Sequence, residues 1–491
     1  MKLFTKTQFK LGMDCPTKLY YSEKDEYVDI SSTDPFLEAL ANGGYQVGEL
    51  AKCEYPQGVE VETHDIYKAY KQTQDLLTRD TVEIFEAALV HGSLAARVDI
   101  LMKRERVITL LEVKSKSYDD GTTSFMTKKG SALTSKWAPY LYDIAFQHYI
   151  ASCLFPDFTI ESFLVLVDKQ AICTIDGLNS KFKVVNHLGA VGKVTIKRNL
   201  EPGEFVGNLL TQVSVEQPLK HLFSIQKFGG TSFVDHINFL ASINQSAHRT
   251  QGKVGKRCHK CQFYPKVINN GQKSGFAECW KHELGLDETT LIEPTVLDLW
   301  NFKSADKLIE QGKILLKDLT EDDISPTSLK KPGLSNSERH WLQVAKVQDC
   351  DSSPYIDQLG LIAEMATWKF PLHFIDFETC SVALPFTKGR HPYEGIAFQF
   401  SHHTVDEKGI VTHAGEFLNV KPGDFPNYEF VAELQQQLSK DSGTIFRYSA
   451  HENTYLNTIH NQLEDDTSIE AHKKQSMMNF IKSITHSTKK S

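Results

Sequence analysis

The sequence lacks a long apolar run, which excludes a membrane-spanning segment. Its longest clean apolar stretch, Phe163–Val167, is far shorter than the roughly 20 residues that cross a bilayer. The first residues, Met1–Lys6, have no apolar core and no small-residue cleavage site, so no signal peptide is predicted. Nine cysteines in 491 residues are too few for a disulfide framework. We therefore expect a reduced, cytoplasmic protein in which some cysteines are free to bind metal.

A global excess of basic residues is also missing. The 54 lysines and arginines are outnumbered by 62 aspartates and glutamates, which gives a net charge of −8. Any nucleic-acid site must therefore come from local patches. The composition, 41% hydrophobic and 24% charged, is ordinary for a globular protein. The length indicates about two to four domains, and we expect the divisions 1–290, 291–368 and 369–491.

Two apolar segments, residues 98–101 and 110–114, predict a β-hairpin. With the turn centred near residues 104–105, Asp99 is expected opposite Leu110. Asp99 would then be a diagonal neighbour of Glu112, which lies two positions after Leu110 on the second strand. The hairpin therefore predicts that acidic side chains from both strands converge at its end.

The second strand adds Glu112 and Lys114, which lie on one face because side chains alternate along a strand. Two carboxylates can hold Mg²⁺ or Mn²⁺ through oxygen, and such a cation polarises a phosphodiester and activates water. Lys114 would position that water or stabilise charge on phosphate. Gln147, on a helix predicted over 142–154, is either a buried core amide or a residue of the site. The alternative for Asp99, Glu112 and Lys114 is a surface ion pair at a strand end, because Glu-x-Lys often occurs by chance.

A second group of candidate ligands begins with Cys258 and Cys261 and closes with Cys279. Two thiolates three positions apart can grip one metal from a tight turn. Residues 236–277 contain no acidic side chain, and cationic surroundings suit both thiolates and a polyanionic partner. The spacing leaves the fourth ligand open among three residues: Cys15, His259 and His282.

These motifs, with the segment Cys15-Pro16-x-Lys18-x-Tyr20, resemble the iron–sulfur nucleases of the RecB type. These enzymes belong to the PD-(D/E)XK superfamily and include AddB-like and CRISPR-associated exonucleases. The resemblance covers roughly residues 1–285. It implies catalysis by Asp99, Glu112, Lys114 and Gln147, with Mg²⁺ or Mn²⁺ on the two acids. It also implies a 4Fe–4S cluster, with zinc as the alternative, on four ligands: Cys15, Cys258, Cys261 and Cys279.

The chain departs from that family in three places. These enzymes often carry a tyrosine four residues after the glutamine, where this chain has Ala151. Val98 stands where the superfamily name has proline. The acid or histidine that these enzymes carry on their first helix is not identified, and Glu49, on a helix predicted over 35–51, is a candidate.

In the second half, alternation over residues 373–379 places Asp376 and Glu378 on one face of a strand. Further strands are expected at 399–401 and 445–448, the latter followed by a helix that carries Glu452. This order resembles the DnaQ-like exonucleases of the RNase H fold. The combination of both halves resembles a bacterial family known only as a domain of unknown function. The alternative for the two strand acids is an ordinary exposed strand end.

DnaQ-like sites use four acids, and the chain offers three of them, Asp376, Glu378 and Glu452. Residues 471–491 contain no acid, so we expect a truncated domain with an incomplete second site. Taken together, we expect an α/β protein: a PD-(D/E)XK nuclease domain, then a partial RNase H-like domain. It would be a metal-dependent DNA exonuclease without a membrane partner. The alternative is a nucleic-acid-binding or scaffold protein with residual nuclease centres.

Overall fold

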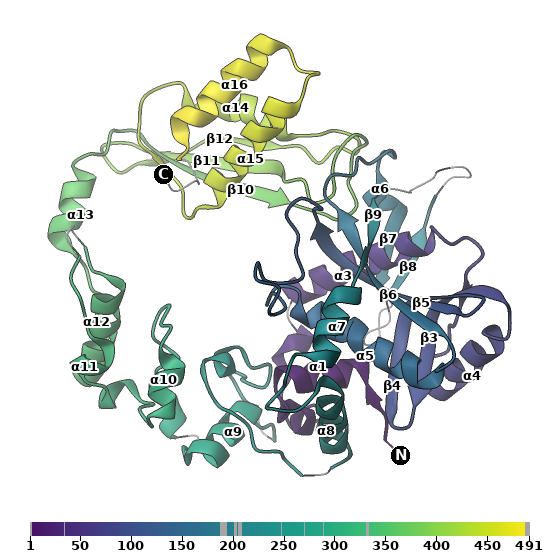
Figure 1. Cartoon of the computed structure of the whole chain (residues 1–491). Coiled ribbons are helices and arrows are strands. Elements are labelled where there is room, and N and C mark those ends of the chain that lie inside the picture. Colours follow the sequence, from purple (N-terminus) through teal and green to yellow (C-terminus); the bar gives the residue numbers. More distant parts are fainter. Residues whose placement is uncertain are drawn as a thin grey trace.

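The computed structural model has a mixed α/β architecture. It contains a large N-terminal sheet and a smaller C-terminal sheet, and Figure 1 shows an arm of short helices, α9 to α13, running between them. No helix in the described part of the chain is long and apolar enough to cross a membrane. The structure describes residues 2–33, 35–186, 194–200, 204, 209–246, 248–269, 271–287, 289–329 and 333–486.

The N-terminal sheet has seven strands in the order β2-β3-β4-β5-β6-β9, with β1 beside β4. Strands β3, β4 and β5 form an antiparallel meander, whereas β5 and β6 are parallel because helix α5 returns the chain between them. The predicted hairpin is therefore confirmed, within longer strands. The bounds are β1 Phe4–Thr5, β2 Val59–Glu60, β3 Thr81–His91, β4 Leu94–Arg104, β5 Val107–Tyr118, β6 Thr159–Asp168 and β9 Leu210–Ser214.

Helices cover both faces of this sheet. Because side chains alternate along β5, Leu110 enters the core beneath α1, α5 and α8, and Leu111 enters the core on the α3 side. Both leucines are fully buried, and each contributes about 2 kcal/mol by burial. The bounds are α1 Lys6–Asp14, α2 Lys18–Tyr21, α3 Pro35–Lys52, α4 Ile66–Leu76, α5 Ala138–Leu154, α7 Glu216–Ser224 and α8 Phe233–Gln245.

Beside the large sheet, α6 (Leu178–Lys181) leads into a two-stranded ribbon, β7 (Phe182–Asn186) and β8 (Val194–Arg198). The sequence also predicts an αβ segment over 182–193, and this segment ends outside the described residues. The connecting arm has its own small apolar core, which includes Trp280, Leu308 and Val344. The helices of the arm are α9 Gly275–Leu284, α10 Ala305–Glu310, α11 Glu321–Ile324, α12 Asn336–Gln348 and α13 Gln358–Met365. Short 3₁₀ turns occupy 256–260, 290–292 and 316–318, and another occupies 30–33, between α2 and α3.

The C-terminal sheet has the order β12-β11-β10-β13. Strand β11 is antiparallel to both neighbours, and β13 is parallel to β10. Ile375 and Phe377 of β10 pack into a core with α14, α15 and α16. Strand β12 and helices α14 and α16 were not predicted. The bounds are β10 Leu372–Cys380, β11 Ile396–Val405, β12 Val411–Leu418, β13 Ile445–Phe446, α14 Asn427–Leu438, α15 His451–Asp465 and α16 Ala471–Ile484.

Candidate active site

The register of the β4–β5 hairpin corrects the predicted pairing. Leu110 pairs with Leu101, not with Asp99, because the two-residue turn lies at residues 105–106. The first turn residue has a φ of +50°, which the tight hairpin turn requires. Continuing this register places Asp99 directly across from Glu112. The prediction that acids of both strands converge therefore holds, with a closer pairing than expected.

The backbone ladder between β4 and β5 ends where these acids meet. The Oδ2 atom of Asp99 accepts a hydrogen bond of 2.7 Å from the backbone N–H of Val113. A side-chain carboxylate thus takes the place of a backbone acceptor. This exchange fixes the Asp99 carboxyl group beside β5, where Glu112 precedes Val113.

Glu112 is fully buried, and each of its oxygens has a charged or polar partner. Lys114 donates at 2.5 Å, Lys6 lies 3.0 Å from both oxygens, and Gln147 donates at 2.5 Å. Burial alone would raise the pKa of the Glu112 carboxyl, but the charges of Lys6 and Lys114 outweigh it and lower this pKa to about 2. Glu112 is therefore ionised at neutral pH, and the helix amide Gln147 belongs to the same cluster.

The pKa of Asp99 is shifted in the opposite direction to that of Glu112. Burial and the nearby charge of Glu112 raise the pKa of the Asp99 carboxyl, against the attraction of Lys6 and Lys114. Burial disfavours the charged form of the two lysines, but the nearby carboxylates outweigh it. They raise the pKa of both Lys6 and Lys114 above the ordinary lysine value. The pair of acids therefore holds its negative charge on Glu112 first.

Sequence reasoning missed Asp143, which lies one helical turn before Gln147 on α5. Its side chain is buried, and neither carboxylate oxygen accepts a hydrogen bond within the described part of the chain. The nearest cations are Lys10 and Lys114, at 3.3 and 3.4 Å from Oδ2. Burial raises the pKa of the Asp143 carboxyl. An acid and an amide spaced four apart on an otherwise apolar helix were the signal that could have indicated this residue.

A third strand contributes Glu86. The β3–β4 register, in which Phe85 pairs with Ile100 and Ala87 with Val98, places Glu86 across from Asp99. Its backbone has a φ of +55°, unusual for a non-glycine residue. Burial, and then the charge of Asp99, raise the pKa of the Glu86 carboxyl to about 6. Glu86, Asp99 and Glu112 thus form a row of carboxyl groups across β3, β4 and β5.

Glu49, the candidate acid of the first helix, has other partners. Its carboxylate lies 2.7 Å from Lys52 and 3.5 Å from Arg198. No contact joins Glu49 to Asp99 or Glu112 among the residues that the structure describes. The family position on the first helix therefore stays without a match.

The four predicted cluster cysteines line one cavity of about 40 Å³. Cys15 directly follows α1, Cys258 and Cys261 lie in and directly after the 3₁₀ turn at 256–260, and Cys279 lies on helix α9. The fold thus brings Cys15 together with three cysteines more than 200 positions later in the chain. The other two candidates for the fourth ligand, His259 and His282, are not among the residues that line it. Burial raises the pKa of the Cys261 thiol to about 11.

The surroundings of this cavity supply donors to sulfur. Arg249 and the Tyr21 hydroxyl lie 3.4 and 3.6 Å from the Cys279 sulfur, which accepts from both. Trp280 also lines the cavity, and its buried indole N–H has no acceptor among the described residues. A Cβ added at Gly252 would lie 2.6 Å from the Thr17 hydroxyl and 3.8 Å from the Cys279 sulfur. These residues fit a group with acceptor atoms that fills the cavity. In the described part of the chain, no three histidine, cysteine or acidic side chains are placed to hold a single metal ion.

The three acids predicted for the second site lie on two elements and differ in exposure. Asp376 and Glu378 share the exposed face of β10, as alternation predicts. Glu452 is buried near the start of α15, and its Oε2 has no hydrogen-bond partner among the described residues. The two elements meet where Thr379 and His451 form a hydrogen bond of 3.0 Å. No contact between Glu452 and the strand acids is present in the described ranges.

Comparison with known families identifies this second region only. Residues 373–488 match the family model of a domain of unknown function, DUF2779. The DUF2779 region begins in β10 and ends after α16, so it coincides with the C-terminal sheet and its helices. This match agrees with the expected likeness to a family of unknown function. No curated protein matches the chain, so the likeness to RecB-type nucleases stays a prediction.

Proposed function

We propose that the N-terminal domain is a metal-dependent nuclease, specifically a DNA exonuclease. The observation that carries this proposal is the fully buried, ionised Glu112, contacted by Lys6, Lys114 and Gln147 and facing Asp99. Burying so many charges within a sheet costs folding free energy. Perturbed titratable groups of this kind are typical of catalytic sites.

The placement of the acids and the amide supports the same function. Asp99 and Glu112 lie on neighbouring strands, β4 and β5, and Gln147 lies on α5, which packs against both strands.

Asp99 and Glu112 are the residues that would hold Mg²⁺ or Mn²⁺, with Glu86 as the neighbouring carboxyl. When bound, such a cation polarises the phosphodiester and lowers the pKa of a coordinated water. Lys114 keeps its proton, so its ammonium can hydrogen-bond to a non-bridging phosphate oxygen and stabilise developing charge. Gln147 fixes one oxygen of Glu112 by its 2.5 Å hydrogen bond, which orients the carboxylate.

The decisive experiment compares cleavage by the wild type and by Lys114→Ala. Labelled single- and double-stranded DNA and RNA are incubated with Mg²⁺ or Mn²⁺, and products are resolved by length. We expect metal-dependent cleavage of DNA by the wild type and a loss of about a hundredfold or more in Lys114→Ala. Lys103→Ala is the matched control, because this lysine lies at the far end of β4 and binds the carbonyls of Leu77 and Arg79. Equal cleavage by wild type and Lys114→Ala would contradict the proposal.

We also propose that Cys15, Cys258, Cys261 and Cys279 hold a 4Fe–4S cluster, with zinc as the alternative. A bound group is supported by the shared cavity, by the donors to sulfur and by the indole N–H of Trp280, which has no acceptor among the described residues. Such a group would join the turn after α1 to α9 and stabilise the domain. Anaerobic purification followed by an absorption spectrum and metal analysis distinguishes the two metals.

A nucleic-acid-binding or scaffold protein with residual nuclease centres is the second candidate. Asp376 and Glu378 are exposed, whereas Glu452 is buried. This difference favours the hypothesis of a residual nuclease centre in the DUF2779 region. Binding of labelled DNA without metal-dependent cleavage by the wild type would support it over the nuclease.

A further inference from the structure

Residues 381–395 form a loop of the DUF2779 region, called the second domain below. This loop lies against the domain built on the large N-terminal sheet, called the first domain. It connects β10 to β11, and Figure 1 shows the C-terminal sheet approaching the side of the large sheet that carries α6 and β9. Cys173 forms two backbone hydrogen bonds with this loop: its carbonyl accepts from Gly389 at 2.7 Å, and its N–H donates to Arg390 at 2.9 Å. The contact therefore extends backbone pairing from one domain to the other.

Apolar packing holds the same loop near the candidate active site. Leu384 is only 1% exposed and belongs to a buried cluster with Val47 and Leu50 of α3. Val113, which lies between Glu112 and Lys114 in the sequence, packs against this cluster. The loop therefore contacts the apolar cluster that supports β5 at the candidate active site.

One hydrogen bond reaches β5 itself. The Tyr393 hydroxyl donates to the backbone carbonyl of Ser115 at 2.6 Å, directly after Lys114. The register of β5 against β6 shifts between Lys114 and Ser117, so the regular ladder is interrupted at this carbonyl. Burial raises the pKa of Tyr393 to about 12, which keeps its hydroxyl a donor at neutral pH.

The conformation of Tyr393 is itself constrained. Its φ is +57°, in the left-handed region that non-glycine residues rarely adopt. The surrounding loop fixes it, because the Tyr393 N–H donates to the Val382 carbonyl at 2.8 Å and the Ser381 hydroxyl donates to the Tyr393 carbonyl at 2.9 Å. Strained residues of this kind persist where several contacts determine them together.

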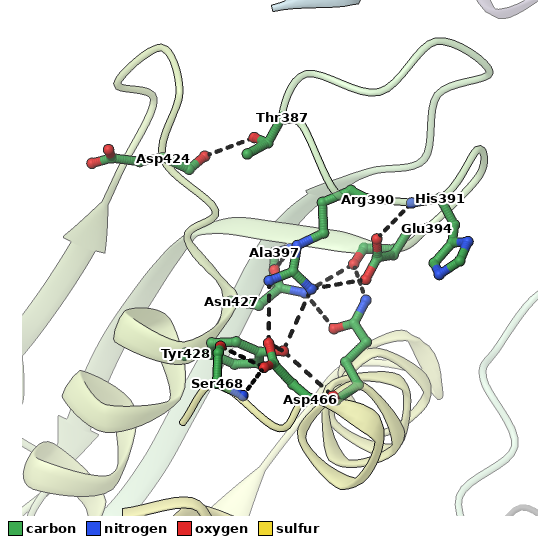
Figure 2. A network of polar contacts seen from close by, with 12 residues as sticks. Thr387, Arg390, His391, Glu394, Ala397, Asp424, Asn427, Tyr428, Asp466 and Ser468 are labelled. Carbon is green, nitrogen blue, oxygen red and sulfur yellow. Dashed lines mark hydrogen bonds and ion pairs between the residues drawn. The ribbon is translucent and has the colours of Figure 1, made fainter. Parts of the chain in front are cut away.

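The other side of the loop is anchored in the second domain by Arg390. Figure 2 shows its guanidinium pointing into a group of polar side chains from the loop, α14 and the end of α15. It lies 3.4 Å from Glu394, 3.5 Å from Asp466 and 3.5 Å from the centre of the Phe425 ring. A charge held by two carboxylates and an aromatic face keeps the loop in one position relative to the C-terminal helices.

We propose that Tyr393 is a positioning residue for the active site of the first domain. Through it, the second domain fixes the backbone of β5 beside Lys114. This inference rests on the proposed nuclease function. Tyr393 acts through the Ser115 carbonyl, which fixes the backbone of the residue next to Lys114. The exposed face of the second sheet, with Asp376 and Glu378, is not required for this role.

The test uses the full chain and the variant Tyr393→Phe, which removes only the hydroxyl. We expect kcat for metal-dependent cleavage to fall about tenfold with KM unchanged, because a small displacement of a catalytic group is costly. Independently of activity, amide hydrogen exchange should accelerate in residues 114–118 and stay unchanged in β3. Tyr455→Phe is the matched control, since the Tyr455 hydroxyl also donates to a backbone carbonyl, that of Cys380, but inside the second domain.

The outcomes separate the two proposals. If the wild type does not cleave nucleic acid, the nuclease function fails, and the exchange of residues 114–118 alone decides the positioning role. Unchanged exchange in that segment, or acceleration spread evenly over the first domain, would overturn the role of Tyr393. The same effect in Tyr455→Phe would also overturn it.

Discussion

Two substitutions with the same chemistry, Glu86→Gln and Glu112→Gln, should change stability in opposite directions. Both remove one carboxyl group, at almost constant volume, from strands of one sheet that lie on either side of β4. In the folded protein the pKa of Glu86 is raised from 4.5 to about 6, whereas the pKa of Glu112 is lowered from 4.5 to about 2. At about 1.4 kcal/mol per pH unit, these differences correspond to about 2 and about 3 kcal/mol.

The sign follows from which state releases its proton first. Glu86 has its raised pKa in the folded state, so its favourable contribution is present below pH 4.5 and is lost as the pH rises through about 6. At pH near 8, Glu86→Gln should therefore be more stable than the wild type by up to about 2 kcal/mol. Near pH 4 this advantage should vanish.

Glu112 behaves in the reverse way. Its contribution is present above pH 4.5 and is lost as the pH falls towards about 2. At neutral pH, Glu112→Gln should be less stable by about 3 kcal/mol, because Lys6 and Lys114 lose their main counter-ion. We also expect this variant to abolish cleavage and keep the fold.

The assay is urea unfolding of the wild type and both variants at about pH 5, 6.5 and 8, following one probe of the large sheet. The reasoning would be refuted if Glu86→Gln were destabilised at the highest pH. It would also be refuted if the gap between the two variants did not widen as the pH rises from 5 to 8. Each variant serves as the volume-matched control for the other.

Two further predictions concern the cofactor and the second domain. Cys15→Ser should lose the brown colour and the iron content and should unfold at a lower temperature, whereas Cys350→Ser, which alters an exposed cysteine outside the cavity, should change none of these three properties. A colourless wild type with stoichiometric zinc would contradict the cluster. The double variant Asp376→Ala, Glu378→Ala should keep most of the cleavage activity; if it lost that activity while Lys114→Ala retained it, the first-domain site would be wrong.

The sequence alone determined the local features of this protein. Alternation along a strand placed Glu112 with Lys114 and Asp376 with Glu378, because side-chain direction depends on a period of two residues. Helical periodicity located α3 and α5, although α5 begins four residues before the predicted start at 142. Motif spacing selected Cys258, Cys261 and Cys279, and the family resemblance added Cys15; all four line one cavity.

Only the tertiary structure decided which distant residues meet. The turn at 105–106, with its positive φ, moved the register by two residues and paired Asp99 with Glu112. Lys6, Glu86 and Asp143 entered the site from α1, β3 and α5, and no local pattern encodes such convergence. The Tyr393 hydrogen bond to Ser115 joins residues 278 positions apart. Contacts of this kind depend on how whole elements pack, because their free energy comes from burial and long-range charge rather than from the sequence of one segment.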